Sequence, residues 1–203
     1  MNSVVIGLTG QTGAGKSTLA ARAGELGCRI VDADRLARQV LEKDSPVLKG
    51  LAEIFGYDII DDEGALKRRL LAGRAFSTKE NTEKLNRLTH SGINSLAAEY
   101  IKEYRQQGGI IIYDCPLLFE SGGDKLCDLT VAVTAPERVR LERIMSRDSL
   151  TEREAMLRIS AQNGEELYRS RADLVIDGSR EPAAVIAEFD GLIGRLARER
   201  GVI

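Results

Sequence analysis

One short stretch constrains this chain more than any other. Residues 10–17 read Gly-Gln-Thr-Gly-Ala-Gly-Lys-Ser, which fits the pattern G-x-x-x-x-G-K-[ST] in full. Glycines let the backbone wrap closely around a polyphosphate and present several N–H groups to its oxygens. The pattern follows an apolar run at residues 4–8 and precedes a helical segment, the context that a phosphate-binding loop requires. We therefore predict a nucleoside-triphosphate site here, rather than a Gly-rich structural turn.

The fixed positions of this loop have predicted roles. The Lys16 ammonium is expected to reach the β- and γ-phosphates, and the Ser17 hydroxyl to coordinate Mg²⁺. The helix that begins here directs its positive end at the anion. The residues expected to bind the nucleotide are Gly10, Gly13, Ala14, Gly15, Lys16, Ser17 and Thr18.

Short apolar runs alternate with longer amphipathic segments along the rest of the chain. Continuous apolar runs of this length suit parallel strands that are covered on both faces. The predicted strands are residues 4–8, 28–31, 110–113, 129–133 and 174–176. The predicted helices include residues 17–26, 34–42 and 182–200. Capping-box patterns at Ser77 with Glu80 and at Thr151 with Glu154 indicate two further helix starts. The alternation predicts an α/β fold, a five-stranded parallel sheet flanked by helices.

Acidic residues follow two of the predicted strands. Asp32 and Asp34 come after the second strand, and Asp114 ends the third. In open α/β sheets, ligands bind beyond the carboxyl ends of the strands, so these acids could serve a metal or a hydroxyl acceptor. Asp34 could equally cap the helix that follows it, and Asp114 could be a strand-end turn residue. The residues alone leave both alternatives open.

Two later segments carry candidate binding groups. The apolar residues within 116–120 could grip a substrate, although core packing is the more usual role of such residues. Arg140, Arg143 and Arg147 share one face of a predicted helix. They could form a solvated face paired with nearby glutamates, but as a group beside a phosphate-binding loop they favour a lid that closes over the phosphates. The single histidine, His90, has no role assignable from its chemistry alone.

Composition excludes several classes of function. The net charge is -2, so no basic excess indicates nucleic acid as a partner. The three cysteines fit no zinc spacing, and a sparse odd set favours a reducing compartment over a disulfide framework. The apolar run at residues 4–8 is too short for a signal peptide or a membrane span. We expect a cytoplasmic protein that binds no membrane.

Taken in order, these elements resemble the dephospho-CoA kinase family over nearly the whole chain. The Asp-Ala-Asp, Pro-Leu-Leu-Phe-Glu and Arg-Ile-x-x-Gln elements are far more specific than the phosphate-binding loop, which many families share. The matching segments are residues 7–18, 31–34, 64–68, 114–120, 158–162 and 172–176, together with Arg38, Val40, Leu71, Phe76, His90, Arg143 and Arg147. The chain departs from the family pattern at Gln11, Ala14, Ser91, Asp177 and Gly178, and the acid at Asp114 is not universal in the family.

The resemblance implies ATP- and Mg²⁺-dependent phosphorylation of the ribose 3′-hydroxyl of dephospho-CoA, the last step of coenzyme A synthesis. It implies a P-loop NTPase fold in one domain spanning residues 1–203, with a helical CoA-binding region at about 60–105 and a lid at about 138–165. The implied catalytic residues are Asp34 as the base, Lys16, Arg143 and Arg147. The implied substrate-binding residues are Asp32, Arg68, His90 and Leu117. The candidate metal ligands come from the loop motif and the strand end instead, and they are Ser17 and Asp114. We expect a monomer or a small homo-oligomer.

Three other functions remain as alternatives. A P-loop kinase could phosphorylate a nucleoside monophosphate or a small sugar instead. A GTP-hydrolysing switch would need a guanine-reading element such as Asn-Lys-x-Asp, which the sequence lacks. A non-catalytic binding module would not need both Lys16 and Asp34.

Overall fold

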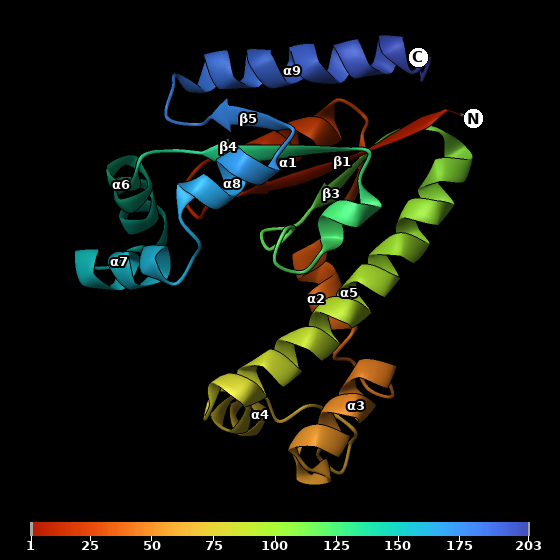
Figure 1. Cartoon of the computed structure of the whole chain (residues 1–203), viewed down its shortest axis with the longest axis vertical. Helices are drawn as coiled ribbons and strands as arrows, with labels where there is room; N and C mark the ends of the chain where they lie inside the picture. Colours follow the sequence, from red (N-terminus) through yellow and green to blue (C-terminus); the bar gives the residue numbers. More distant parts are fainter. Residues whose placement is uncertain (1, 203) are drawn as a thin grey trace. The chain divides into compact units, whose positions relative to one another are not determined.

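The computed structural model describes residues 2–202 and contains a five-stranded parallel sheet of order β2-β3-β1-β4-β5 (Figure 1). β1 pairs with β3 on one side and with β4 on the other, so the strand that leads into the phosphate-binding loop lies at the centre. All five predicted strands are confirmed. The strands are β1 (Ser3–Gly10), β2 (Arg29–Asp32), β3 (Gly109–Asp114), β4 (Leu129–Thr134) and β5 (Leu174–Asp177).

Helices fill the intervals between strands, as the alternation predicts. The helices in chain order are α1 (Lys16–Glu25), α2 (Ala33–Gln39), α3 (Pro46–Phe55), α4 (Arg68–Ala75), α5 (Lys79–Gln107), α6 (Glu137–Asp148), α7 (Glu152–Ser160), α8 (Glu165–Arg171) and α9 (Pro182–Glu199). Short 3₁₀ turns lie at η1 (Tyr57–Ile59) and η2 (Gly123–Leu126). Across residues 2–202, none of these helices has the length and apolar character needed to cross a membrane.

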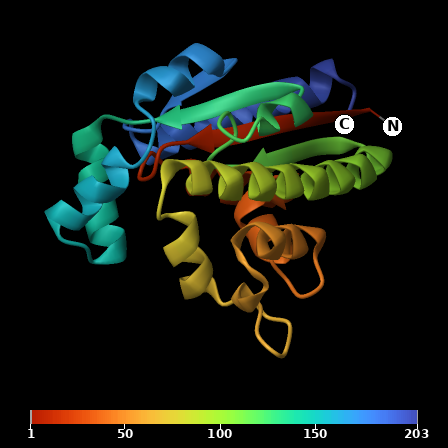
Figure 2. The same ribbon diagram turned by 60° about the horizontal axis from the view of Figure 1, so that its bottom comes forward.

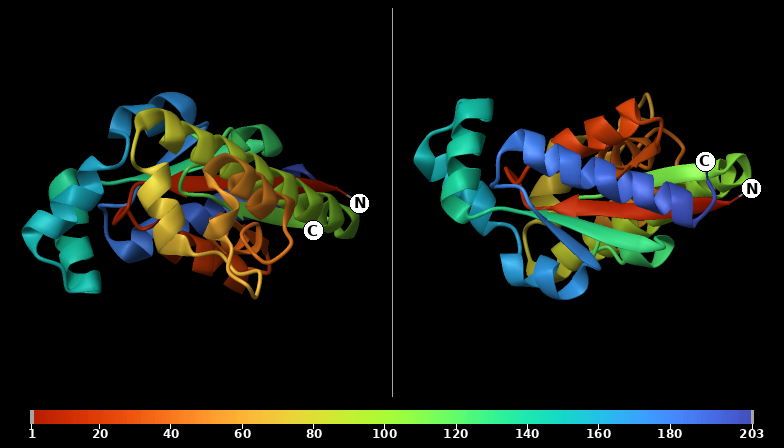
Figure 3. Two further views of the ribbon diagram at one scale, coloured as in Figure 1. Left: turned by 90° about the horizontal axis from the view of Figure 1, so that it is seen from below. Right: turned by 90° about the horizontal axis from the view of Figure 1, so that it is seen from above.

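The chain divides into two compact units. The first contains the residues up to Val31 and those from Ile101 onward, and the second is residues 32–100. In the first unit, α1 and α9 pack on one face of the sheet, and α9 runs along it (Figure 3). Alternate residues of β1, such as Ile6 and Leu8, bury against Leu19 of α1 and Phe189 of α9. This core holds the carboxyl end of β1, and therefore the phosphate-binding loop, in a fixed position.

The second unit has an apolar core of its own, formed by α3, α4, η1 and part of α5. Helix α3 begins where the Ser45 hydroxyl accepts a hydrogen bond from the Leu48 backbone N–H, with Pro46 in the first turn. Proline suits this position because its missing N–H would be unpaired there in any case. Leu51 and Phe55 of α3 are buried in the core of this unit.

Two predicted helix starts are corrected by the structure. The capping-box prediction at Ser77 and Glu80 is wrong, because the Thr78 hydroxyl accepts from the Asn81 N–H and α5 begins at Lys79. The Ser77 hydroxyl instead donates to the Arg74 carbonyl at 2.7 Å. The second correction is that Asp34 is not the cap of α2. The Asp32 carboxylate has that role, accepting from the N–H groups of Asp34 and Arg35. The capping box at Thr151 is confirmed.

Candidate active site at the phosphate-binding loop

The loop between β1 and α1 adopts a backbone that only glycine tolerates well. Gly10 has φ 153°, and a Cβ atom there would lie 2.4 Å from the Val133 carbonyl oxygen. Gly13 and Gly15 also have positive φ, 78° and 112°. Helix α1 starts immediately after Gly15, whose lack of a side chain means that no side-chain cap covers the first N–H groups of the helix. These donors and the positive end of the helix together favour an anion.

Lys16 and Asp114 form an ion pair inside this site. Asp114 is the last residue of β3 and is paired in register with Leu8 of β1. The two charged side chains are only 16% and 15% exposed. A half-buried charge pair of this kind holds both groups in place until a ligand of either sign competes for one partner. A phosphate can take Lys16, and a cation can take Asp114.

The oxygen-bearing side chains at this site suit Mg²⁺ better than they suit a metal ion whose ligands all come from the protein. Among residues 2–202, no cluster of three or more His, Cys, Asp or Glu side chains could hold a metal ion. Mg²⁺ is usually bound by one or two protein groups together with substrate phosphates and water. The exposed Ser17 hydroxyl and the Asp114 carboxylate are groups of that kind.

The three arginines of α6 that were predicted for the lid lie in three different environments. Arg143 Nη1 donates to the carbonyl oxygens of Gly13 and Ala14, at 3.3 and 3.4 Å. Arg147 pairs with Asp148 at 2.8 Å. Arg140 corrects the prediction of an exposed stripe, because it is only 5% exposed and its Nε donates to the Ala135 carbonyl. Burial lowers the pKa of the Arg140 guanidinium.

Helix α6 and α7 form a hairpin beyond the carboxyl end of β4 (Figure 2). The chain turns at Ser149, which has φ 54°, and the capping box then starts α7. The hairpin has only a small apolar cluster, centred on Ile144, Ala155 and Ile159. Few buried contacts are typical of a segment that moves during a binding cycle.

A pocket of about 210 Å³ lies beside the loop. Its lining includes Ala14 and Thr18 from the loop and α1, Arg143 from α6, and Gly178 and Arg180 from the segment after β5. A Cβ atom at Gly178 would lie 2.0 Å from the Ala14 carbonyl oxygen. The backbone here therefore requires glycine, although residue 178 is one of the positions where the chain departs from the family pattern. The neighbouring Asp177 carboxylate accepts from the Ser179 N–H and hydroxyl, which lowers its pKa.

Comparison with known proteins identifies the family. The dephospho-CoA kinase family model matches residues 4–183. A dephospho-CoA kinase from Corynebacterium jeikeium is 40% identical over 194 residues, covering 95% of this chain and 100% of that protein. The chain belongs to the dephospho-CoA kinase family. Members of this family are kinases that use ATP, which agrees with the phosphate-binding loop.

Solved structures show the same fold. The crystal structure of TT1252 from Thermus thermophilus superposes with a TM-score of 0.77 at 31% identity, covering 98% of each chain. A dephospho-CoA kinase from Campylobacter jejuni superposes with a TM-score of 0.63 at 24% identity, covering 96% of this chain and 97% of that one. The sheet of this chain is therefore that of a P-loop kinase.

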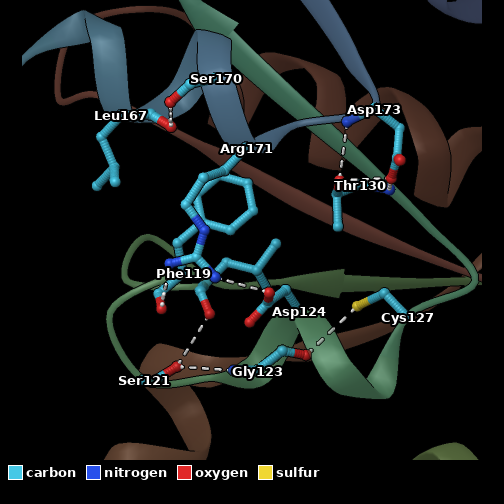
Figure 4. Close-up of polar contacts among 11 residues, drawn as sticks. Phe119, Ser121, Gly123, Asp124, Cys127, Thr130, Leu167, Ser170, Arg171 and Asp173 are labelled. Atoms are coloured by element: carbon cyan, nitrogen blue, oxygen red, sulfur yellow. Dashed lines mark hydrogen bonds and ion pairs between the residues drawn. The ribbon is translucent and has the colours of Figure 1, made fainter.

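The loop after β3 divides between core and surface. Leu118 and Phe119 are buried, whereas Leu117 is 43% exposed. Only Leu117 of the three is therefore available to contact a ligand. Figure 4 shows how α8 anchors this loop: Arg171 donates to the Phe119 carbonyl and pairs with Asp124, and its guanidinium lies 4.8 Å from the centre of the Phe119 ring.

The remaining predicted residues belong to the second unit. The Asp34 carboxylate is exposed and has no hydrogen bond or ion pair with any residue of 2–202, because the cap of α2 is Asp32. Arg68 is the first residue of α4 and is exposed, and His90 is half-buried in α5. The structure brings Lys16, Ser17, Asp114 and Arg143 together in the first unit. The contribution of the second-unit residues to the same reaction stays a prediction.

Sequence reasoning missed two residues that contact the loop. Gln162 Oε1 accepts from the Thr12 N–H at 2.8 Å, and the Asn163 carbonyl accepts from Gln11 Nε2 at 3.3 Å. Both lie about 150 residues from their partners along the chain, and no local pattern indicates such contacts. The Arg-Ile-x-x-Gln element, which ends at Gln162, was the available signal.

Proposed function

We propose that this chain transfers the γ-phosphoryl group of ATP to the ribose 3′-hydroxyl of dephospho-CoA, giving coenzyme A and ADP. The observation that carries the proposal is the extent of the family match, residues 4–183. A match confined to residues 10–17 would support only nucleotide binding. This match also includes the segments around Asp34, Arg68 and Leu117, which the generic loop does not explain.

The nucleotide side of the reaction uses the first unit. Glycine backbone groups and the start of α1 bind the phosphates, and the Lys16 ammonium neutralises charge on the transferring group. Ser17 and Asp114 would hold Mg²⁺, which supplies charge neutralisation at the phosphates when bound. A bound phosphate would compete with Asp114 for the Lys16 ammonium and so free the Asp114 carboxylate. The adenine would occupy the pocket beside Gly178.

The acceptor side would use the remaining predicted residues. A ribose hydroxyl is a weak nucleophile, and Asp34 would orient it and accept its proton. The exposed, unpaired carboxylate of Asp34 suits this role better than a carboxylate engaged in capping a helix. Arg68, His90 and Asp32 would bind the acceptor, and the exposed Leu117 would contact its apolar pantetheine arm.

The α6–α7 hairpin would act as the lid, within residues of about 138–165. Arg143 already contacts the loop backbone, and Arg147 would leave Asp148 to meet the phosphates when the lid closes. We propose that the chain acts as one kinase domain with ATP and dephospho-CoA as its small-molecule partners. Neither nucleic acid nor a membrane has a part in this function, and a monomer or small homo-oligomer would suffice.

The test is an ADP-release assay with a panel of acceptors: dephospho-CoA, AMP, CMP, adenosine and gluconate. We expect turnover with dephospho-CoA well above that with the others, and a product phosphorylated at the 3′ position by NMR. A clear preference for another acceptor would disprove the proposed substrate while leaving a kinase. Steady GTP hydrolysis without transfer to any acceptor would favour a switch protein.

A further inference from the structure

The connection between α7 and α8, residues 161–164, is bonded to the phosphate-binding loop from two directions. The Gln162 side chain accepts from the Thr12 backbone N–H, and the Gln11 side chain donates to the Asn163 backbone carbonyl. Gln11 is only 3% exposed, so this side chain is held in the interior.

The same connection is bonded to the loop that carries Leu117. Asn163 Nδ2 donates to Glu120 Oε1 at 2.7 Å. A hydrogen bond to a charged oxygen is stronger than a neutral one of the same length. Asn163 therefore has two partners on two different loops. Its backbone is fixed by the nucleotide loop, and its side chain fixes the end of the Pro116–Glu120 segment.

A second anchor holds the Leu117 loop independently of Asn163. Arg171 of α8 contacts the Phe119 carbonyl and the Asp124 carboxylate, as Figure 4 shows. Tyr168 of the same helix packs against the Phe119 ring at 6.3 Å between centroids. These contacts stabilise the loop whether or not a nucleotide is bound, because none of them involves residues 10–17. Asn163 links residues 10–17 to Glu120 at the end of the Leu117 loop, whereas the start of that loop has a separate contact, from the Thr9 hydroxyl to the Pro116 carbonyl at 3.2 Å.

We propose that Asn163 is a positioning residue that transmits nucleotide binding at residues 10–17 to the Leu117 loop. Phosphate bound to the loop backbone restricts Gln11 and Thr12, which restricts residues 162–163. The Asn163 side chain then restricts Glu120 and, through it, the apolar side chain three residues earlier. The consequence for acceptor binding rests on the proposed function, whereas the ordering of the loop by nucleotide does not.

The test measures hydrogen exchange in residues 116–124 with and without a non-hydrolysable ATP analogue and Mg²⁺. The amides of Ser121, Gly122 and Gly123 are bonded within this loop, so their exchange reports its order. In the wild type we expect the analogue to slow exchange here. In Asn163→Ala and in the isosteric Asn163→Asp, which opposes a carboxylate to Glu120, we expect this slowing to be lost. Affinity for the analogue should stay within about threefold, because the Asn163 backbone carbonyl remains.

Three further variants separate coupling from simple destabilisation. Gln11→Ala removes one of the two hydrogen bonds between this connection and the phosphate-binding loop, so it should reduce the slowing, while the bond from the Thr12 N–H to Gln162 remains. Arg171→Ala should speed exchange both with and without the analogue, because it removes the independent anchor. Ser170→Ala is the matched control, since the Ser170 hydroxyl donates only to carbonyls of its own helix, and the slowing should persist.

Kinetics add a readout that a purely structural role would not produce. Asn163→Ala should raise KM for dephospho-CoA at saturating ATP by about three- to tenfold, with little change in KM for ATP. The inference would be overturned if the analogue slowed hydrogen exchange in Asn163→Ala as much as in the wild type. It would also be overturned if the analogue did not slow exchange in the wild type. A wild type that shows the slowing but phosphorylates no dephospho-CoA would disprove the proposed function and leave the coupling intact.

Discussion

The two units hold their assigned residues in different ways. In the first unit, Lys16 and Asp114 are mostly buried and form an ion pair, with Asp114 at the end of β3 and Lys16 at the start of α1. In the second unit, Asp34 and Arg68 are exposed on short helices around a separate apolar core. A half-buried charge pair keeps its geometry without a ligand, whereas exposed side chains acquire theirs when a ligand binds. We therefore predict that the first unit serves the phosphate chemistry and that the second serves recognition of the acceptor.

The largest effect is expected at the first unit's charge pair. Lys16→Ala should nearly abolish phosphoryl transfer, by at least about 10³-fold in kcat, because the ammonium neutralises charge that builds on the transferring group. Steady-state ADP release measures this, and circular dichroism checks that the fold is kept. Asp114→Asn is the matched variant, because it breaks the same ion pair but keeps the Lys16 ammonium. Turnover of Lys16→Ala within a few-fold of wild type would refute the phosphate-binding assignment.

The next effect tests whether the second unit also contributes chemistry. Asp34→Asn should lower kcat by about 10²–10⁴-fold with little change in ATP affinity, because a general base is lost and the size is kept. Its thermal midpoint should match wild type, since Asp34 caps nothing.

Asp32→Ala is the contrasting variant for stability. It removes the cap of α2 and should cost about 1 kcal/mol in the free energy of unfolding. A loss of stability in Asp34→Asn, with kcat preserved, would mean that the second unit has no catalytic base at this position.

A pair of glycines compares steric tolerance in the two units. A methyl group at Gly178 would meet the Ala14 backbone at 2.0 Å, and one at Gly92 would meet the Val47 side chain at 2.3 Å. Overpacking costs about 1–3 kcal/mol. Gly178→Ala should therefore weaken ATP binding by about 5- to 150-fold, measured by calorimetry. Gly92→Ala should lower stability by a similar free energy and leave ATP binding unchanged. Equal ATP affinity in both variants would show that the pocket beside Gly178 is not the nucleotide site.

A smaller effect is expected on acceptor recognition. Arg68→Ala should raise KM for dephospho-CoA at least about tenfold, or roughly 1.4 kcal/mol, with little change in KM for ATP. A guanidinium binds a pyrophosphate through paired, charge-assisted hydrogen bonds, so Arg68→Lys should restore only part of the loss. Arg69→Ala, one residue along the same exposed helix start, is the matched control for general loss of charge. An unchanged KM in Arg68→Ala would remove this residue from the acceptor site.

The smallest effect concerns acid stability. Arg74 hydrogen-bonds the Asp58 carboxylate in the second unit and lowers its pKa, and Arg22 does the same to Asp190 in the first. A carboxylate with a lowered folded pKa stabilises the protein above its unfolded pKa, near 3.9, and this contribution is lost as pH falls through the folded value. The thermal midpoint should therefore fall less steeply below about pH 4 in Asp58→Asn than in wild type.

Asp190→Asn provides the comparison between units. If the units unfold separately, Asp58→Asn should change only the transition of the second, and Asp190→Asn only that of the first. Both pairs are partly exposed, with 36% and 60% of the Arg74 and Asp58 side chains accessible and 31% of each side chain in the Arg22–Asp190 pair, so salt should reduce both effects. Identical acid profiles in the two variants and wild type would contradict a role for these pairs.

The first unit was the more predictable from sequence. Its five strands are continuous apolar runs, and the loop at residues 10–17 is defined by a local pattern with one physical purpose. Such features depend on neighbours in the chain, so they can be recognised without the fold. The ion pair between Lys16 and Asp114 could not be predicted, although both residues were assigned to the site, because it depends on the register of β1 and β3.

The second unit was predicted less completely. Helix α3 has clear local signals, Ser45 as the cap and Pro46 after it, and these would have indicated the helix. The start of α5 was misplaced by one residue, because Ser77 and Thr78 are equally good caps and the choice depends on Arg74, whose carbonyl engages Ser77. The prediction for Arg140 in the first unit was wrong for a similar reason. Its charge predicts exposure, yet the packing at Gly13 and the Ala135 carbonyl bury it.

The central place of β1 has a consequence for how the chain is made. β1 is synthesised first among the strands, yet its neighbours β3 and β4 begin at Gly109 and Leu129, after the whole second unit has been translated. The second unit is continuous in sequence and can collapse around its own core while the ribosome is still adding the rest. Until β3 emerges from the ribosome, the apolar residues of β1 remain without a strand partner on the nascent chain. They can then bind chaperones or aggregate. Slowing translation between residues 32 and 100 should therefore lengthen that exposure, whereas slowing it after β4 should not.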